Sequence, residues 1–235
     1  MSKPNKITFI AESEYAWEMS ELPIPAASAI PDWWKNMRPY STDDNTLQMN
    51  PGPTVTAKKC FPLLDGISAG YLVTLWSDVM INSRPDKPLV QWGTGQPVFD
   101  VWDPSQVDAV ELPEGYGQTV LKYLHGWLIQ TPPGWSTLIT HPIGYPNLPF
   151  RAMSGLVDTD TLKTGINTPI LIKDGFSGVL EKGTPMFQVI PVKRENWESE
   201  AVQGDYIKQG YDNERLRSRI ISSYGRNLRS NKSYK

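Results

Sequence analysis

Short runs of β-favouring residues alternate with turn residues over 130–191, and this is the clearest pattern in the chain. The runs are WSTLIT, MSGLVDTD, NTPILIK and MFQVIP, and stretches rich in Pro, Gly and Asn separate them. Short strands and turns at near-regular spacing are typical of a β-sandwich or a barrel. The sequence therefore predicts a mainly β fold, organised as a single sandwich or barrel.

The most apolar part of the chain is KKCFPLLDGISAGYLVTLWSDVMI. Its second half predicts a strand at Tyr71–Trp76 that extends toward Ile81. Because the run is almost continuously apolar, this strand is expected to be buried on both faces. Further strands are expected at Ile7–Ala11 and at Leu121–Gln130, where Gly126 indicates a bulge.

A short N-terminal helix is predicted after the proline-punctuated segment LPIPAASAIPDWW. Pro31 suits the first turn of a helix, where its missing N–H costs nothing. Trp33, Trp34 and Met37 then share one helical face. The preferred interpretation is a helix that plugs one end of the β core. In the alternative, Trp33 and Trp34 bind a sugar, a base or a partner.

The C-terminal part differs from the rest in charge, which predicts a β-rich core domain over 1–204 and a basic helical tail over 205–235. The tail carries eight Lys/Arg against three Asp/Glu, whereas the whole chain has a net charge of −2. Within 213–229 apolar residues recur at helical spacing, which indicates an amphipathic helix that docks on its own core or on another chain. The predicted partner-binding residues are Arg215, Leu216, Arg219, Ile220 and Tyr224.

Several broad classes of protein are disfavoured by composition. The single cysteine, Cys60, excludes an internal disulfide, and no apolar run approaches the length of a membrane span. A nearly neutral charge gives no clear indication of nucleic-acid binding. The expectation is a soluble protein that is intracellular where it is synthesised, with no membrane partner.

The chain lacks the residues that most catalytic and metal-binding sites require. The chain has two histidines, one cysteine and no G-x-S-x-G motif, so no cofactor, metal site or catalytic residue is predicted. The exception is GLVDTD, where Asp158 and Asp160 would project from one strand face as a general base or a cation site. In the preferred interpretation one carboxylate caps a turn and the other pairs with Arg151 or Lys163.

Segments spread over most of the first 200 residues resemble an uncharacterised family of tailed-phage proteins, known mainly from phages of marine cyanobacteria, with bacterial relatives. They are Pro23–Trp34, Lys58–Tyr71, Thr131–Leu138, Leu148–Asp160 and Lys182–Trp197. The resemblance implies a phage protein, in the host cytoplasm during synthesis and then in the virion. It implies no established activity.

A second resemblance concerns the dUTPase and dCTP-deaminase fold, in which PPGWSTLI, GLVDTD and KGTPMFQVIP have counterparts in the same order. It implies a β-clip-like fold, with Asp158 matching the catalytic Asp and Gln188 matching the Gln of the G-x-x-I-A-Q-L segment that packs beside it. Here, however, HPIGYPNLP replaces the phosphate-gripping segment, and the Gly-rich C-terminal arm is missing. The resemblance thus implies the fold without the hydrolase.

Two functions are therefore expected from the sequence. The first is a non-enzymatic virion or accessory binding and assembly protein, whose partners are itself or other phage proteins. The alternative is a nucleotide- or small-ligand-binding enzyme of dUTPase-like fold that uses Asp158, with Asp160 and Arg151 beside it and Gln188 as a weaker ligand-binding candidate.

Overall fold

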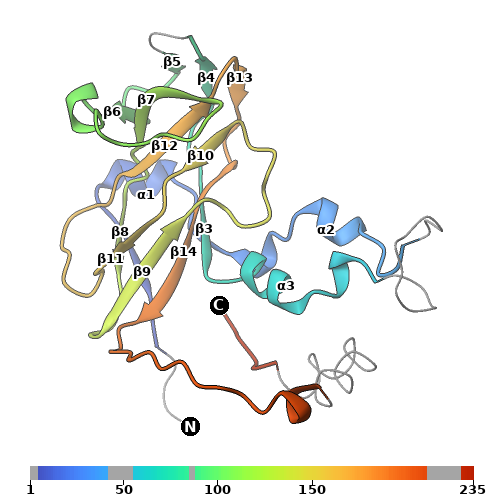
Figure 1. The fold of residues 1–235 in the computed structure, drawn as a ribbon. Helices are drawn as coiled ribbons and strands as arrows, with labels where there is room; N and C mark the ends of the chain where they lie inside the picture. The colour runs from blue at the N-terminus through green and yellow to red at the C-terminus, as the bar shows by residue number, and fades with distance from the viewer. Residues whose placement is uncertain (1–4, 42–54, 85–87, 211–228) are drawn as a thin grey trace.

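A computed structural model describes residues 5–41, 55–84, 88–210 and 229–235. The fold is mainly β and is assembled from antiparallel sheets (Figure 1), as the alternation of strand and turn residues predicts. Within the described residues no sheet closes into a barrel. The sheets instead share one hydrophobic core.

The largest sheet has five strands in the order β11-β9-β14-β3-β2. It takes three strands from the stretch with the clearest strand pattern and one from the most apolar segment of the chain. Its strands are β2 (Ile24–Pro25), β3 (Tyr71–Thr74), β9 (Trp135–Thr140), β11 (Gly155–Val157) and β14 (Pro185–Lys193).

Three smaller sheets complete the β structure. A four-stranded sheet, β10-β12-β7-β6, contains β6 (Phe99–Val101), β7 (Tyr116–Tyr123), β10 (Phe150–Ala152) and β12 (Thr168–Lys173). A three-stranded sheet, β13-β4-β5, contains β4 (Val79–Asn82), β5 (Leu89–Trp92) and β13 (Ser177–Leu180). The two-stranded sheet pairs β1 (Thr8–Ala11) with β8 (Trp127–Gln130).

The core lies where these sheets face one another. Val73 and Phe187 enter it from the five-stranded sheet, Leu121 from the four-stranded sheet, Val79 from the three-stranded sheet and Trp127 from β8. All five side chains are almost completely buried. Burial of apolar area on this scale is the main stabilising contribution that the sequence provides.

The helices are short and lie outside the sheets. The predicted N-terminal helix is confirmed as α2 (Asp32–Asn36), with Pro31 at its N-cap position. The other described helices are α1 (Glu14–Met19), α3 (Phe61–Ile67), a helical segment at 206–210 and the 3₁₀ turns η1 (Ala26–Ser28), η2 (Ala57–Lys59) and η3 (Pro104–Gln106). None of them is long and apolar enough to cross a membrane.

Two predicted strands are wrong in extent because the chain turns inside them. The segment 71–81 is divided into β3 and β4, which belong to different sheets. The predicted strand over 121–130 divides in the same way into β7 and β8. Gly126 lies between them at φ +70°, a backbone conformation that suits glycine, and so it marks a turn and not a bulge.

Residues 194–210, here called the C-terminal arm, leave the end of β14 and run away from the sheets (Figure 1). The arm lacks regular structure as far as Asp205, and 206–210 are helical. The predicted partner-binding residues of the tail, from Arg215 to Tyr224, lie outside the described residues. Residues 229–235 return to the core beside α3 and β3.

Candidate functional site

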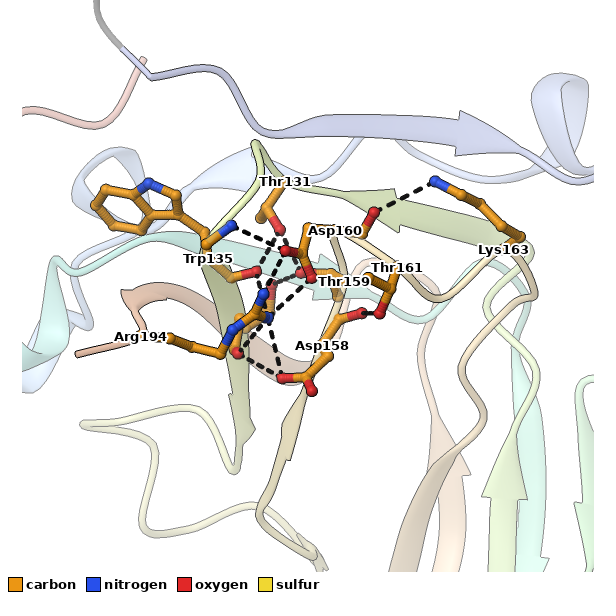
Figure 2. Close-up of polar contacts among 11 residues, drawn as sticks. Thr131, Trp135, Asp158, Thr159, Asp160, Thr161, Lys163 and Arg194 are labelled. Atoms are coloured by element: carbon orange, nitrogen blue, oxygen red, sulfur yellow. Dashed lines mark hydrogen bonds and ion pairs between the residues drawn. The ribbon is translucent and has the colours of Figure 1, made fainter. Parts of the chain in front are cut away.

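The turn that carries Asp158 and Asp160 lies at one end of the five-stranded sheet. Val157, at the end of β11, pairs with Thr137 of β9, and Lys193, at the end of β14, pairs with Trp135 of β9. This register brings three segments together: the turn after β11, the start of β9 and the residue after β14. Figure 2 shows the side chains of Asp158 and Asp160 directed at the guanidinium of Arg194.

A tight turn before β9 supplies one of the donors. Trp135 N–H donates to the Pro132 carbonyl at 3.2 Å, and Gly134 has φ +82°. Proline followed by glycine at the two central positions is typical of a type II turn, in which glycine provides the positive φ. The Gly134 N–H is then free to donate to an Asp160 carboxylate oxygen, at 2.9 Å.

Asp160 is held by the strongest set of contacts in this region. Its two carboxylate oxygens accept hydrogen bonds from both terminal nitrogens of Arg194, the Nη1–Oδ1 distance being 2.8 Å. Only 6% of its side chain is exposed. The Arg194 guanidinium and the Gly134 N–H lower the pKa of Asp160 from 3.8 to about 2. The ion pair is therefore stabilising above about pH 4 and is lost only as the pH falls through about 2.

Asp158 contacts the same guanidinium from a more open position. Its Oδ1 accepts a hydrogen bond from the Ser136 hydroxyl at 2.6 Å and lies 3.2 Å from Arg194 Nη1. Arg194 also donates to the Ser136 Oγ, at 3.2 Å. In contrast to Asp160, 62% of the Asp158 side chain is exposed. Two carboxylates thus share one cation.

Three threonine hydroxyls form a hydrogen-bonded chain that fixes the turn. The Oγ1 atom of Thr159 lies 2.7 Å from that of Thr131 and 2.7 Å from that of Thr137. Thr137 and Thr159 are completely buried. A chain of hydroxyls with its hydrogen bonds made holds its residues in one arrangement. Asp158, Asp160 and Arg194, here called the Asp–Arg cluster, therefore rest on a rigid base.

This arrangement suits a structural ion pair better than catalysis. Two carboxylates that share a proton raise one pKa, but the guanidinium placed between them has the opposite effect on Asp160. The described residues include no group of three His, Cys, Asp or Glu side chains positioned to hold a metal ion. The cluster can therefore orient the turn, and Asp158 alone offers an open carboxylate.

The placement of the carboxylate pair on a strand is wrong, because β11 ends at Val157 and the pair occupies the turn that follows. The predicted ion-pair partners are also incorrect. Arg151 lies on β10 of the four-stranded sheet. Lys163 donates its Nζ to the main-chain oxygen of Asp160, at 3.3 Å, and not to the carboxylate. Arg194 takes the predicted role.

The other ligand-binding candidates lie away from this cluster. Trp34 is buried and Trp33 donates its indole N–H to the Gly144 carbonyl at 2.6 Å, so α2 packs against the β9–β10 connection. Gln188 is fully buried, accepts from Ile143 N–H and donates to two carbonyl oxygens at the end of α3. These contacts give Trp34 and Gln188 structural roles.

The histidines also lie in packed surroundings. His125 is buried against Phe187, with ring centroids 4.9 Å apart, and its Nδ1 accepts the Trp127 N–H. Burial lowers the pKa of His125 to about 4, so that it is neutral near pH 7. His141 is partly buried, and burial lowers its pKa as well. Neither ring contacts the Asp–Arg cluster in the described structure.

Arg194 was missed as a site residue by the sequence analysis. The available signal was its position directly after a long apolar strand, in the segment KRENW. Only the pairing register of β14 with β9 places that position beside the Asp158 turn. A single sequence does not contain this register.

Comparisons with known proteins give no further guidance: no protein-family model matches the chain, and no curated protein is significantly similar to it.

Proposed function

We propose that the chain is a non-enzymatic assembly protein of the phage-virion type, which binds further copies of itself through its C-terminal region. The exposed apolar side chains of the C-terminal arm are the main support. Trp197 is 85% exposed, and Val202, Tyr206 and Ile207 are each at least 70% exposed. Large apolar residues gathered on one short segment are typical of a binding surface.

The form of the arm fits the same role. An extended segment that leaves a folded core can lie along a neighbouring molecule and bury aromatic anchors there, at a cost in ordering entropy. The arm itself has four Asp/Glu against two Lys/Arg, and the positive charge lies in the tail over 205–235, whereas the first 204 residues have an excess of acids. Opposite charges on the two regions favour association between copies.

The Asp–Arg cluster supports the non-enzymatic part of this proposal. Arg194 occupies both oxygens of Asp160 and contacts Asp158, so the pair is already bound within the chain. Arg194 is also the first residue of the arm. The cluster therefore anchors the arm to the sheet and fixes the point from which it departs.

The test is the oligomeric state of the full chain, measured by light scattering after size exclusion. The wild type is expected to associate, and a triple change of Trp197, Tyr206 and Ile207 to Ser is expected to shift it to the monomer. Leu156→Ser is the matched control, since Leu156 is 62% exposed on β11 outside the arm. A monomeric wild type, or a variant that associates unchanged, would contradict the proposal. Deletion of 205–235 is expected to weaken association as well.

The exposed carboxylate of Asp158 favours one rival, a nucleotide- or small-ligand-binding enzyme. That function requires the protein to be stabilised by its ligand. Thermal melting with each deoxynucleoside triphosphate and Mg²⁺ distinguishes the two. A rise in melting temperature that Asp158→Asn abolishes would favour the enzyme, whereas no rise is expected for the assembly protein.

A further inference from the structure

A cavity of about 330 Å³ lies beside the Asp–Arg cluster and is separate from the C-terminal arm. Its walls come from the segment before β1, from β3 and β14, from the turn that leads into β9 and from residues 232–234 near the C-terminus. Its volume is at the lower end of the range for small-molecule sites. The cavity therefore suits a ligand with one ring system.

The lining combines aromatic rings with positive charge. Tyr71, Trp135 and Tyr234 contribute rings, and Lys6 and Lys232 contribute ammonium groups. Among the described residues that line it there is no Asp or Glu. Aromatic faces stack on flat rings, and ammonium groups bind phosphate or carboxylate oxygens. The two features together select a flat molecule with an anionic group.

The wall shared with the Asp–Arg cluster is rigid. Thr131 and Trp135 line the cavity, and the Thr131 hydroxyl donates to the Trp135 main-chain oxygen at 2.9 Å. Figure 2 shows the Trp135 indole pointing away from Asp160. The threonine hydroxyl network thus fixes the backbone of Trp135. A cavity wall that is already in place lowers the entropic cost of binding a ligand.

The opposite wall is tied down by the C-terminal residues. Asp65 of α3 accepts hydrogen bonds from Arg229, at 2.6 Å, and from Lys232, at 2.7 Å. Tyr234 packs edge-to-face on Tyr71 with centroids 6.2 Å apart. Lys232 is thus held at the cavity wall by Asp65, and Lys6 brings a further ammonium group from the segment before β1.

We propose that this cavity binds a small molecule in which one aromatic ring system carries a single phosphate or carboxylate group. Trp135 and the two tyrosines hold the ring, while Lys6 and Lys232 bind the anion. A nucleoside monophosphate and an aromatic carboxylic acid share this chemistry. The proposal is independent of assembly through the arm, because no arm residue lines the cavity.

The test is calorimetric titration of the full chain with phenyl phosphate. Phenol and inorganic phosphate serve as the two halves of that probe, and each is expected to bind at least roughly tenfold more weakly, because each makes only part of the contacts. Lys6→Gln is expected to weaken phenyl phosphate binding several-fold while leaving the Asp65 pairs intact. Lys173→Gln, an exposed lysine on β12, is the charge-matched control and is expected to have no effect.

Two natural sources of the ligand are then compared, thymidine monophosphate and indole-3-acetate. If either one binds more tightly than phenyl phosphate, the result supports the proposal and shows whether the anionic group is a phosphate or a carboxylate. The proposal is wrong if phenyl phosphate does not bind, if inorganic phosphate binds as tightly, or if Lys6→Gln and Trp135→Leu both bind phenyl phosphate like the wild type. Association of the arm variants is measured separately, so failure here leaves the assembly proposal standing.

Discussion

Two tryptophans show that the sheets bury large apolar side chains, whereas the C-terminal arm leaves them exposed. Trp127 of β8 is 1% exposed and belongs to the shared core, whereas Trp197 of the arm is 85% exposed. Folding of the chain explains the first residue through the apolar area that it buries. Folding of the single chain does not explain why Trp197 is exposed. We therefore expect Trp197 to contact another molecule.

The same contrast holds for polar groups. At the turn after β11, the hydroxyls of Thr131, Thr137 and Thr159 and the carboxylate of Asp160 each have a hydrogen-bond partner within the chain. The hydrogen bonds of the arm beyond Arg194 are local, such as that from Lys208 N–H to Asp205 Oδ1 at 3.1 Å. The polar groups of that turn are thus satisfied within the chain, while the described part of the arm remains open for a partner.

The largest effect is expected in the core. Trp127→Ala removes a fully buried side chain that also packs against Trp17, with centroids 6.2 Å apart. The expected loss in the free energy of unfolding is about 3–5 kcal/mol, from lost burial and the cavity left behind. Urea denaturation measures it. A loss under about 1 kcal/mol would show that the core does not close as described.

Protonation of His125 gives the next effect. Its native pKa of about 4 lies below the 6.5 of an exposed histidine, so between these values the unfolded chain binds a proton that the native protein does not. Stability is expected to fall by about 2 kcal/mol from this group between pH 7 and pH 5. His125→Asn should remove that part of the slope when melting is followed across the range. An unchanged slope would contradict a buried, neutral His125.

The threonine network predicts a smaller loss. Thr159→Val removes the hydroxyl between Thr131 and Thr137 and leaves the buried Thr137 hydroxyl and the part-buried Thr131 hydroxyl each short of a partner. The expected cost is about 1–2 kcal/mol by urea denaturation. Thr161→Val, at an exposed position of the same turn, is the control and should cost less. Equal losses for the two variants would argue against the network.

The smallest effect on stability is expected in the arm. Trp197→Ala should change the free energy of unfolding by less than about 0.5 kcal/mol, because the side chain is exposed. The free energy of unfolding is measured at low protein concentration, where association contributes little to apparent stability. A loss as large as that of Trp127→Ala would place Trp197 in the fold of the single chain and remove the contrast.

The sequence predicts the fold class well because strand and turn residues carry local signals. The segments WSTLIT and NTPILIK form β9 and β12 as expected, and Asp32–Asn36 forms the expected helix. The errors arise where tertiary pairing decides. Nothing local in 121–130 shows that its two halves enter different sheets around Gly126.

The candidate site is predictable in part for the same reason. Asp158 and Asp160 are visible in the sequence as a close pair, and their use in a turn was the preferred interpretation. Their partner, Arg194, is 34 residues beyond Asp160 and reaches it only through the register of β14 against β9. The cavity beside them was equally hidden, since its walls come from both ends of the chain.

The central claim, that the arm binds another copy of the chain, is tested most directly by hydrogen–deuterium exchange at a low and a high protein concentration. Amides around Trp197 and Tyr206 are expected to exchange fast in the dilute sample and markedly more slowly in the concentrated one. Amides of β9 and β14 should exchange equally slowly in both. Arm amides that exchange fast and equally at both concentrations would contradict the account.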